Sequence, residues 1–276
     1  MANRIDTAFG RARREGRAAF MPFLTAGDPD LETTAELIRA CAANGADVIE
    51  LGVPFSDPIA DGPTIQSSFV RALAHGYGVQ DVLAMLRKAR KRTNVPILTM
   101  VSYSIVERLG VETYFKQASK AGVDGVILPD LPADEANVVV QLGKRHRLHT
   151  VFLVAPTTDD QRMKMIVRRS KGFIYYVSVT GTTGARTELP SDLAEHIRRL
   201  KSLTQKPVAV GFGVSRPEQV RAVAADADGV IVGSAIVRKI HECGDRPREE
   251  LVAEVGRFVR ELASGTRRAP EELRTT

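Results

Sequence analysis

The stretch from residue 49 to residue 64 reads IELGVPFSDPIADGPT, and it sets a carboxylate into what is otherwise a buried strand. Glu50 interrupts the apolar run of residues 48–51, and a long loop rich in proline and aspartate then leads to Asp61. An unpaired charge in a dry site is costly. Glu50 is therefore expected either to have a structural partner or to serve in proton transfer with a shifted pKa.

Short apolar segments alternate with segments of helical period along the chain, which indicates an α/β fold. The apolar runs are mostly continuous, as is typical of parallel strands buried on both faces. Eight strand–helix units in about 250 residues predict a closed (β/α)8 TIM barrel rather than an open doubly wound sheet. Capping-box patterns at residues 158–161 and 215–218 predict two of the helix starts. The eight expected strands cover residues 19–24, 47–51, 96–101, 125–128, 150–154, 173–177, 208–210 and 229–232.

The chain of 276 residues shows no linker and no break in composition, so a single barrel domain is expected over residues 1–265. The Arg-rich, amphipathic segment 1–16 predicts an extra N-terminal helix, and it lacks the apolar core of a signal peptide. Residues 266–276 form a polar tail that is expected to be mobile. No Gly-x-Gly-x-x-Gly motif follows the first strand, which argues against a dinucleotide-binding fold.

Charge distribution, the length of apolar runs and the cysteine content limit the classes of protein to which the chain can belong. The net charge is +6, but the cations are scattered, and their densest run, residues 87–92, ends a predicted helix, where cations favour the dipole. Without a recognisable motif, nucleic-acid binding is not expected. No apolar run approaches the roughly 18 residues of a membrane span. Cys41 and Cys243 form neither a disulfide framework nor a metal-binding pattern, which fits a cytoplasmic location.

Two strand ends carry glycines in a pattern that suggests a phosphate site. The active site of a TIM barrel lies at the C-terminal ends of its strands. Strand seven ends in Gly211, Phe212 and Gly213, and strand eight in Gly233 and Ser234. Those two loops build the usual phosphate site of such barrels, from exposed backbone N–H groups beside a helix N-terminus. A phosphorylated substrate is therefore predicted, with tight turns as the alternative use of these glycines.

Glu50 and Asp61 form a candidate acid–base pair at the end of the second strand. The five histidines fall in helices, loops or strand starts, so no metal site is expected. No lysine lies inside a strand, which disfavours a Schiff-base mechanism. The pattern predicts proton transfer without a metal or a cofactor. Two structural alternatives stay open, an ion pair for Glu50 and a helix N-cap role for Asp61 ahead of Pro63.

Two loops are long enough to act as lids over such a site. One covers residues 55–62, and the other covers residues 179–190, with Gly181 and Gly184 as possible hinges. Plain surface loops are the alternative interpretation of both segments.

Residues 50–66 closely resemble the signature of the tryptophan synthase alpha subunit family. The resemblance extends over nearly the whole chain and includes residues 21–29, 180–186, 210–215 and 232–237. It implies a (β/α)8 barrel that cleaves indole-3-glycerol phosphate to indole and glyceraldehyde 3-phosphate, with no cofactor of its own. It also implies a beta-subunit partner in an alpha2beta2 tetramer, which takes the indole through a tunnel and joins it to serine with pyridoxal phosphate.

The resemblance also implies roles for individual residues. Glu50 resembles the general acid/base of the family, which protonates indole C3 and takes a proton from the glycerol hydroxyl. Asp61 resembles the family's aspartate, which accepts a hydrogen bond from the indole N–H. Thr183 matches a lid threonine, and Asp57 lies on the other movable loop. The apolar wall around the indole corresponds to Phe23, Met100, Ile127, Leu153 and Tyr175, and the phosphate site to Gly184, Gly213, Gly233 and Ser234.

The chain departs from the family after the third strand, where the family often has Tyr-x-Asn and this chain has Ser102 and Ser104. The change is expected to affect the support of Asp61 and contacts with a beta subunit. Two further functions stay open, a stand-alone indole-3-glycerol phosphate lyase and a non-catalytic activating subunit. An isomerase of the histidine or tryptophan pathways is a further alternative. Such barrels need a different acid–base layout, and the motif at the second strand argues against them.

Overall fold

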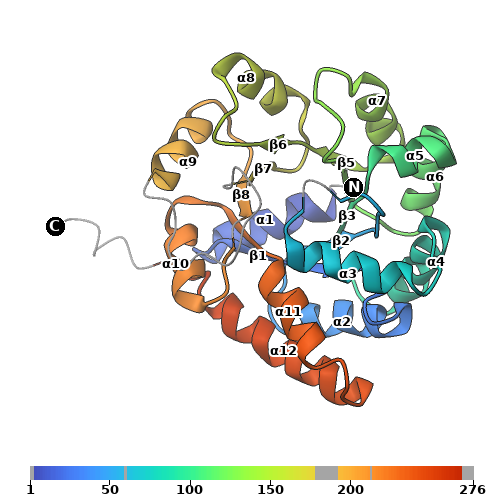
Figure 1. Cartoon of the computed structure of the whole chain (residues 1–276). Helices are drawn as coiled ribbons and strands as arrows, with labels where there is room; N and C mark the ends of the chain where they lie inside the picture. Colours follow the sequence, from blue (N-terminus) through green and yellow to red (C-terminus); the bar gives the residue numbers. More distant parts are fainter. Residues whose placement is uncertain (1–2, 59–60, 178–191, 212, 269–276) are drawn as a thin grey trace.

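The computed structural model describes residues 3–58, 61–177, 192–211 and 213–268, in which strands and helices alternate (Figure 1). The strand segments are β1 (Ala19–Thr25), β2 (Ile49–Gly52), β3 (Ile97–Met100), β4 (Gly125–Ile127), β5 (His149–Val151), β6 (Leu153–Val154), β7 (Ile174–Val177), β8 (Val208–Gly211) and β9 (Gly229–Val232). The helices are α1 (Arg4–Arg14), α2 (Leu31–Ala43), α3 (Pro63–Leu73), α4 (Val79–Ala89), α5 (Tyr103–Leu109), α6 (Val111–Lys120), α7 (Asn137–His146), α8 (Asp160–Arg169), α9 (Leu193–Ser202), α10 (Pro217–Asp226), α11 (Ser234–Glu242) and α12 (Arg248–Ser264), with a short 3-10 turn at Arg90–Arg92.

The strands form one parallel sheet that curves into a ring. Their order is β5-β4-β3-β2-β1-β9-β8-β7-β6, so the two ends of the sheet are β5 and β6. A single residue, Phe152, separates these two segments, which are the halves of one expected strand. Its N–H bonds to the Ser170 hydroxyl at 3.3 Å, outside the strand ladder. The sheet therefore closes through this strand, and the predicted (β/α)8 barrel is confirmed.

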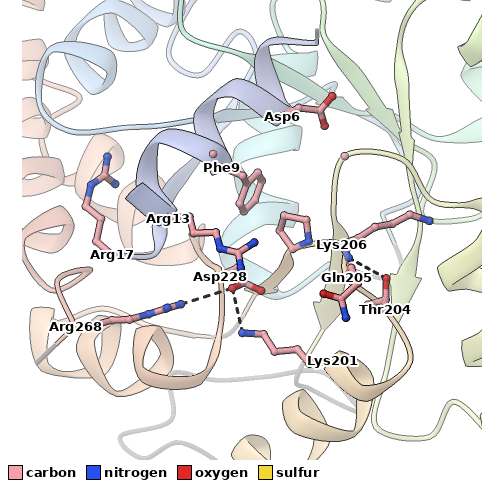
Figure 2. Close-up of a pocket in the computed structure, with 13 residues that line it drawn as sticks. Asp6, Phe9, Arg13, Arg17, Lys201, Thr204, Gln205, Lys206, Asp228 and Arg268 are labelled. Carbon is pink, nitrogen blue, oxygen red and sulfur yellow. Dashed lines mark hydrogen bonds and ion pairs between the residues drawn. The ribbon is translucent and has the colours of Figure 1, made fainter. Parts of the chain in front are cut away.

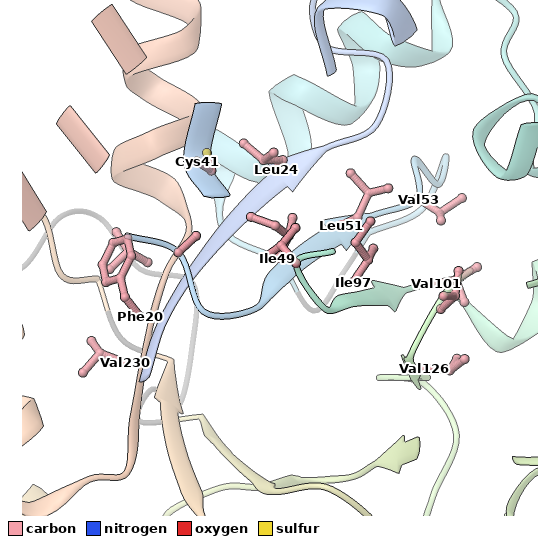
Figure 3. Close-up of a cluster of buried hydrophobic side chains, with 14 of the residues drawn as sticks. Phe20, Leu24, Cys41, Ile49, Leu51, Val53, Ile97, Val101, Val126 and Val230 are labelled. Carbon is pink, nitrogen blue, oxygen red and sulfur yellow. The ribbon is translucent and has the colours of Figure 1, made fainter. Parts of the chain in front are cut away.

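Alternation along each strand sorts the side chains into two layers. Phe20, Leu24, Ile49 and Leu51 point outward and pack between the strands and the surrounding helices (Figure 3). Residues of the opposite parity point into the barrel, among them Met21, Val48, Leu98 and Ile127. Because side chains alternate with a period of two, Glu50 shares the inward parity of Val48. Strand pairing also sets Glu50 beside Phe23.

The expected N-terminal helix exists as α1, and it plugs one end of the barrel (Figure 1). Its buried residues, Ile5, Ala8, Phe9 and Ala12, belong to the same cluster as the inward side chains of the strands. The ring centroids of Phe9 and Phe173 lie 5.3 Å apart. Apolar packing of α1 thus closes the end of the barrel where the strands begin. The C-terminal ends of the strands lie at the opposite end, where TIM barrels have their active sites.

Three aspartates reinforce the plugged end, each placed just before a strand. Every one accepts a backbone N–H from the start of the neighbouring strand, and all three also meet cations. Two of those cations, Arg4 and Arg11, belong to α1, so the ion pairs fasten the plug. Asp47 bonds to Phe20 N at 2.9 Å and pairs with Arg11 and Arg17. Asp124 bonds to Ile97 N at 2.8 Å and pairs with Arg4 and Arg90, and Asp228 bonds to Val208 N at 3.0 Å and pairs with Lys201 and Arg268.

The first three residues of the predicted C-terminal tail form backbone and side-chain contacts with the barrel. The N–H of Ala18 donates to the carbonyl of Thr266 at 3.1 Å, and the backbones of Arg17 and Arg267 form an isolated antiparallel β-bridge. The Arg268 guanidinium donates to two carbonyl oxygens at the C-terminal end of α10, those of Ala224 and Ala227, at 3.1 and 2.8 Å. These contacts were not predictable because they join segments far apart in the sequence. Residues 269–276 lie outside the described residues.

Both capping-box predictions place the helix start one residue too early. The N-cap of α8 is Asp159, whose carboxylate accepts the N–H of Arg162 at 2.8 Å, while the Thr158 hydroxyl accepts from Ala155. The N-cap of α10 is Arg216. Pro217 occupies the first helical position, where its fixed φ is favourable, and this shifts the helix start away from the predicted position.

Asp47→Ala is expected to lower the free energy of unfolding by about 3 kcal/mol or more, because it leaves Arg17 without a buried partner. Urea unfolding measures the change. Glu112→Gln removes the exposed pair between Glu112 and Arg145 and should change stability by less than about 1 kcal/mol. Equal losses in the two variants would contradict a special role for the buried carboxylate.

Candidate active site

Strand β2 carries Glu50 into the barrel, where the residue is 1% exposed. Among the described residues, neither carboxyl oxygen has a hydrogen-bond partner. Its neighbours in register on the adjacent strands, Phe23 and Leu98, are apolar. The alternative of a buried ion pair is therefore not found within the described ranges, and the group lies in a dry, apolar setting.

This setting raises the pKa of Glu50 to about 8, mainly through burial. The negative charge of Asp61 adds to the increase, and the nearby Tyr175 hydroxyl partly offsets it without reaching hydrogen-bond geometry. Burial disfavours the charged form of a carboxyl group. At neutral pH Glu50 is therefore protonated and can donate a proton.

Asp61 reaches the same end of the barrel from the loop after β2. Its N–H donates to the carbonyl of Pro58 at 3.0 Å. The side-chain amide of Gln66 on α3 donates to the carbonyl oxygens of Pro58 and Asp61, at 3.1 and 2.8 Å. These bonds tie the loop to α3 on both sides of residues 59 and 60, which lie outside the described residues.

The Asp61 carboxylate does not cap a helix. The N-cap of α3 is Gly62, and Pro63 occupies the first turn, so the structural alternative for Asp61 is wrong. Burial raises the pKa of Asp61 to about 6, which leaves it mostly charged at neutral pH. At neutral pH Glu50 thus holds its proton while Asp61 is mostly charged, so one group can act as an acid and the other as an anion.

The five residues predicted to form the apolar wall belong to two neighbouring hydrophobic clusters in the barrel. Strand pairing sets Met100 beside Ile127 and Leu153 beside Tyr175. Phe23 is buried in a neighbouring cluster, and Met100 packs against both clusters. These side chains give the barrel interior an apolar wall near Glu50. Sequence reasoning missed the support of Phe23, which comes from Ile65, Phe69 and Val237.

Two glycines make room for the aromatic residues of this wall. A Cβ at Gly211 would lie 2.7 Å from the Tyr175 hydroxyl, and one at Gly52 would lie 2.4 Å from Cζ of Phe23. Burial raises the pKa of Tyr175 well above its usual value, and the charges of Glu50 and Asp61 act in the same direction. Gly211 was expected to serve the phosphate loop, and its contact with Tyr175 could not be seen in the sequence.

The candidate phosphate residues lie at the ends of β8 and β9, which pair side by side. Gly233 is the N-cap of α11, and Ser234 is its first residue. The first N–H groups of a helix have no partner within it, so they can bind an anion. A Cβ at Gly233 would lie 3.6 Å from Cβ of Phe23, whereas one at Gly213 would meet nothing within 4 Å. This corner therefore adjoins the apolar wall. Phe212, Thr183 and Gly184 lie outside the described residues.

The residues that depart from the family pattern have partners of their own. The Ser102 hydroxyl donates to Asp130 at 2.6 Å and lies 2.7 Å from the Ser104 hydroxyl. The N–H of Tyr103 also donates to the Asp130 carboxylate. Ser102 therefore ties the start of α5 to the loop after β4. Beside it, a groove of about 820 Å³ runs along Phe55 and Ser104 to Arg108, and Asp57 is exposed on the adjoining loop.

Two further properties concern the described residues as a set. They contain no group of three or more His, Cys, Asp or Glu side chains arranged to hold a metal ion. None of their helices has the length and apolar character needed to cross a lipid bilayer.

Known proteins resemble this chain in sequence over nearly its whole length. The family described as "Tryptophan synthase alpha chain" matches residues 9–267. The alpha chain of Geobacter sulfurreducens is 45% identical over 267 residues, which is 97% of this chain and 98% of that protein. That of Caldanaerobacter subterraneus subsp. tengcongensis is 44% identical over 260 residues, covering 94% and 98%.

Solved structures show the same similarity. A chain of Mycobacterium tuberculosis tryptophan synthase superposes with a TM-score of 0.88 at 36% identity, covering 98% of this chain and 100% of that one. The alpha subunit from Legionella pneumophila gives 0.88 at 37% identity, covering 96% and 99%. Sequence and fold agree, and this chain belongs to the tryptophan synthase alpha chain family.

Proposed function

We propose that this chain cleaves indole-3-glycerol phosphate by a retro-aldol reaction to indole and glyceraldehyde 3-phosphate, with Glu50 as the general acid/base. One observation carries the assignment of Glu50: its carboxyl group is buried inside the barrel mouth without a hydrogen-bond partner among the described residues. A protonated carboxyl group in an apolar site is suited to donate a proton to a carbon of an aromatic ring.

The reaction begins with transfer of the Glu50 proton to indole C3, which turns the ring into an electrophile. The carboxylate then removes the proton of the glycerol hydroxyl next to the bond that breaks. The C–C bond electrons return to the ring as the aldehyde forms, so indole regains its aromatic system and Glu50 its proton. One carboxyl group thus serves both steps.

Asp61 has the complementary role in this proposal. Its carboxylate accepts a hydrogen bond from the indole N–H and stabilises the positive charge that develops on the ring when C3 is protonated. The pKa of about 6 keeps it charged while Glu50, with a pKa of about 8, holds its proton. Between these two values both groups are in the required form.

The remaining candidate residues bind the substrate. We assign the indole pocket to Phe23, Met100, Ile127, Leu153 and Tyr175, which line the barrel interior beside Glu50. Gly213, Gly233 and Ser234, together with Gly184, grip the phosphate at the corner next to Phe23. Thr183 and the loop of Asp57 close over the bound substrate.

The function includes a partner. A beta subunit receives the indole for tryptophan synthesis, and we assign the complex alpha2beta2 stoichiometry. Pyridoxal phosphate belongs to that beta subunit, while the residues that carry the alpha reaction are side chains of this chain alone. The two buried free thiols, Cys41 and Cys243, fit a cytoplasmic location.

The two other functions predict different behaviour. A non-catalytic activating subunit has no need for the carboxyl pair, and both groups are present at the mouth. A stand-alone lyase would cleave the substrate as fast alone as with a beta subunit. The rate of indole release by the isolated chain and by the complex separates these functions, and acceleration by the partner is expected for an alpha subunit.

Glu50→Gln should abolish nearly all indole release, because the amide neither donates a carboxylic proton nor accepts one. The loss should be about 100-fold or more, the usual contribution of general acid–base catalysis. Indole formation measured with and without a beta subunit tests this, with the exposed Glu261→Gln as the matched control. A Glu50→Gln variant that keeps more than about a tenth of the wild-type rate would exclude the assigned role.

Ser234→Asp should weaken the binding of glycerol phosphate by about tenfold or more, because it sets one anion against another. Titration calorimetry with glycerol 3-phosphate measures the affinity. Ser202→Asp makes the same change at an exposed position at the end of α9 and should leave it unaltered. If both variants bind equally well, the phosphate does not bind at α11.

Glu50→Gln should also flatten the pH dependence of stability. The pKa of Glu50 rises from 4.5 to about 8, so between these values the folded protein holds a proton that the unfolded chain has released. The wild type should therefore lose about 1 kcal/mol of stability per pH unit relative to the variant as pH rises from about 5.5 to about 7.5. Parallel curves from urea unfolding would show that Glu50 is not protonated in the fold.

A further inference from the structure

A pocket of about 470 Å³ opens at the plugged end of the barrel (Figure 2). Its lining includes Gly172, Pro207 and Asp228, which precede β7, β8 and β9, so it lies at the end opposite Glu50. Helix α1 contributes Phe9 and Arg13 to it. This cavity takes no part in the proposed cleavage reaction.

Cations outnumber carboxylates around Asp228 in this pocket. Its Oδ1 lies 3.1 Å from Nζ of Lys201 and 3.6 Å from Nη2 of Arg268. Its other oxygen accepts the N–H of Val208. Arg13 lines the same pocket and forms no ion pair within the described parts of the chain. Two cations therefore share the Asp228 carboxylate, and Arg13 adds a third positive charge to the same pocket.

The other acidic and basic groups of the lining do not correct this imbalance. Asp6, which lies 2.9 Å from Nε2 of His149, adds one carboxylate to the lining and leaves the cations in the majority. Arg17 is already matched by Asp47 and Glu15. Lys206 adds positive charge at the rim, where burial and the neighbouring Lys171 lower its pKa. The pocket keeps a positive potential, which attracts anions.

Neutral donors lie among these cations. The Thr204 hydroxyl accepts the N–H of Lys206 at 3.0 Å, so its own proton remains available to a ligand oxygen. Gln205 is exposed on the same segment and lines the pocket. Hydroxyl and amide donors beside guanidinium and ammonium groups favour an oxyanion over a halide.

We propose that this pocket binds a small oxyanion with at least two negative charges, held between Arg13, Lys201 and Arg268. Phosphate esters and polycarboxylates share this chemistry. The three cations come from α1, α9 and the end of the described chain, so the ligand bridges segments far apart in the sequence. A ligand that binds only the folded chain also stabilises it in proportion to its occupancy.

Amide NMR titration of the full chain locates the binding. The probes are inorganic phosphate, pyrophosphate and citrate, each at an ionic strength held constant with sodium chloride. Signals of Arg13, Thr204 and Gln205 report on the pocket, and those of Gly233 and Ser234 report separately on the barrel mouth. Saturable shifts at the pocket signals are expected, with a dissociation constant below about 5 mM for at least one probe. The preferred probe then distinguishes a phosphate ligand from a polycarboxylate.

Two variants make the assignment specific. Arg13→Ala and Gln205→Glu should each weaken binding about fivefold or more, because they remove a cation or add an anion at exposed positions. Arg14→Ala and Gln141→Glu make the same charge changes at exposed positions that do not line the pocket, and they should leave the affinity unchanged. The proposal is overturned if no pocket signal saturates below about 20 mM, or if Arg14→Ala weakens binding as much as Arg13→Ala.

Discussion

Burial of the Glu50 carboxyl group inside the barrel is the constraint on which the site depends. The alternation of β2 points it inward, Phe23 and Leu98 leave it in apolar surroundings, and α1 closes the barrel behind it. Burial makes the charged form of a carboxyl group unfavourable in this position, so the group keeps its proton. The protein therefore holds a weak acid ready at neutral pH.

The two ends of the barrel use carboxylates in opposite ways. At the plugged end Asp47, Asp124 and Asp228 each accept a backbone N–H and form ion pairs with cations, which adds stability. At the mouth Glu50 has neither kind of partner within the described residues. This separation follows the general layout of TIM barrels, in which stability and catalysis occupy opposite faces. It also explains why a barrel can tolerate one unfavourable carboxyl group.

Local patterns in the sequence were sufficient to predict the strands and helices and to select the two carboxyl groups as candidate site residues. Continuous apolar runs identified the strands, and the interruption at Glu50 marked the candidate site. Contacts between distant segments were not predictable in the same way, because no local pattern encodes them. The fit of Gly211 to Tyr175, the support of Phe23 by α3 and the anchoring of Arg268 are of this kind. The break of the fifth strand at Phe152 and the exact helix caps at Asp159 and Arg216 also depend on neighbours in space.

The most direct test of this account is an NMR titration of the Glu50 side-chain carboxyl carbon in the isolated chain, assigned by its loss in Glu50→Gln. A pKa near 8 is expected for Glu50, and a lower value in Asp61→Asn, because the negative charge of Asp61 contributes to the increase. A Glu50 carboxyl group that titrates near the ordinary value of 4.5 would contradict it.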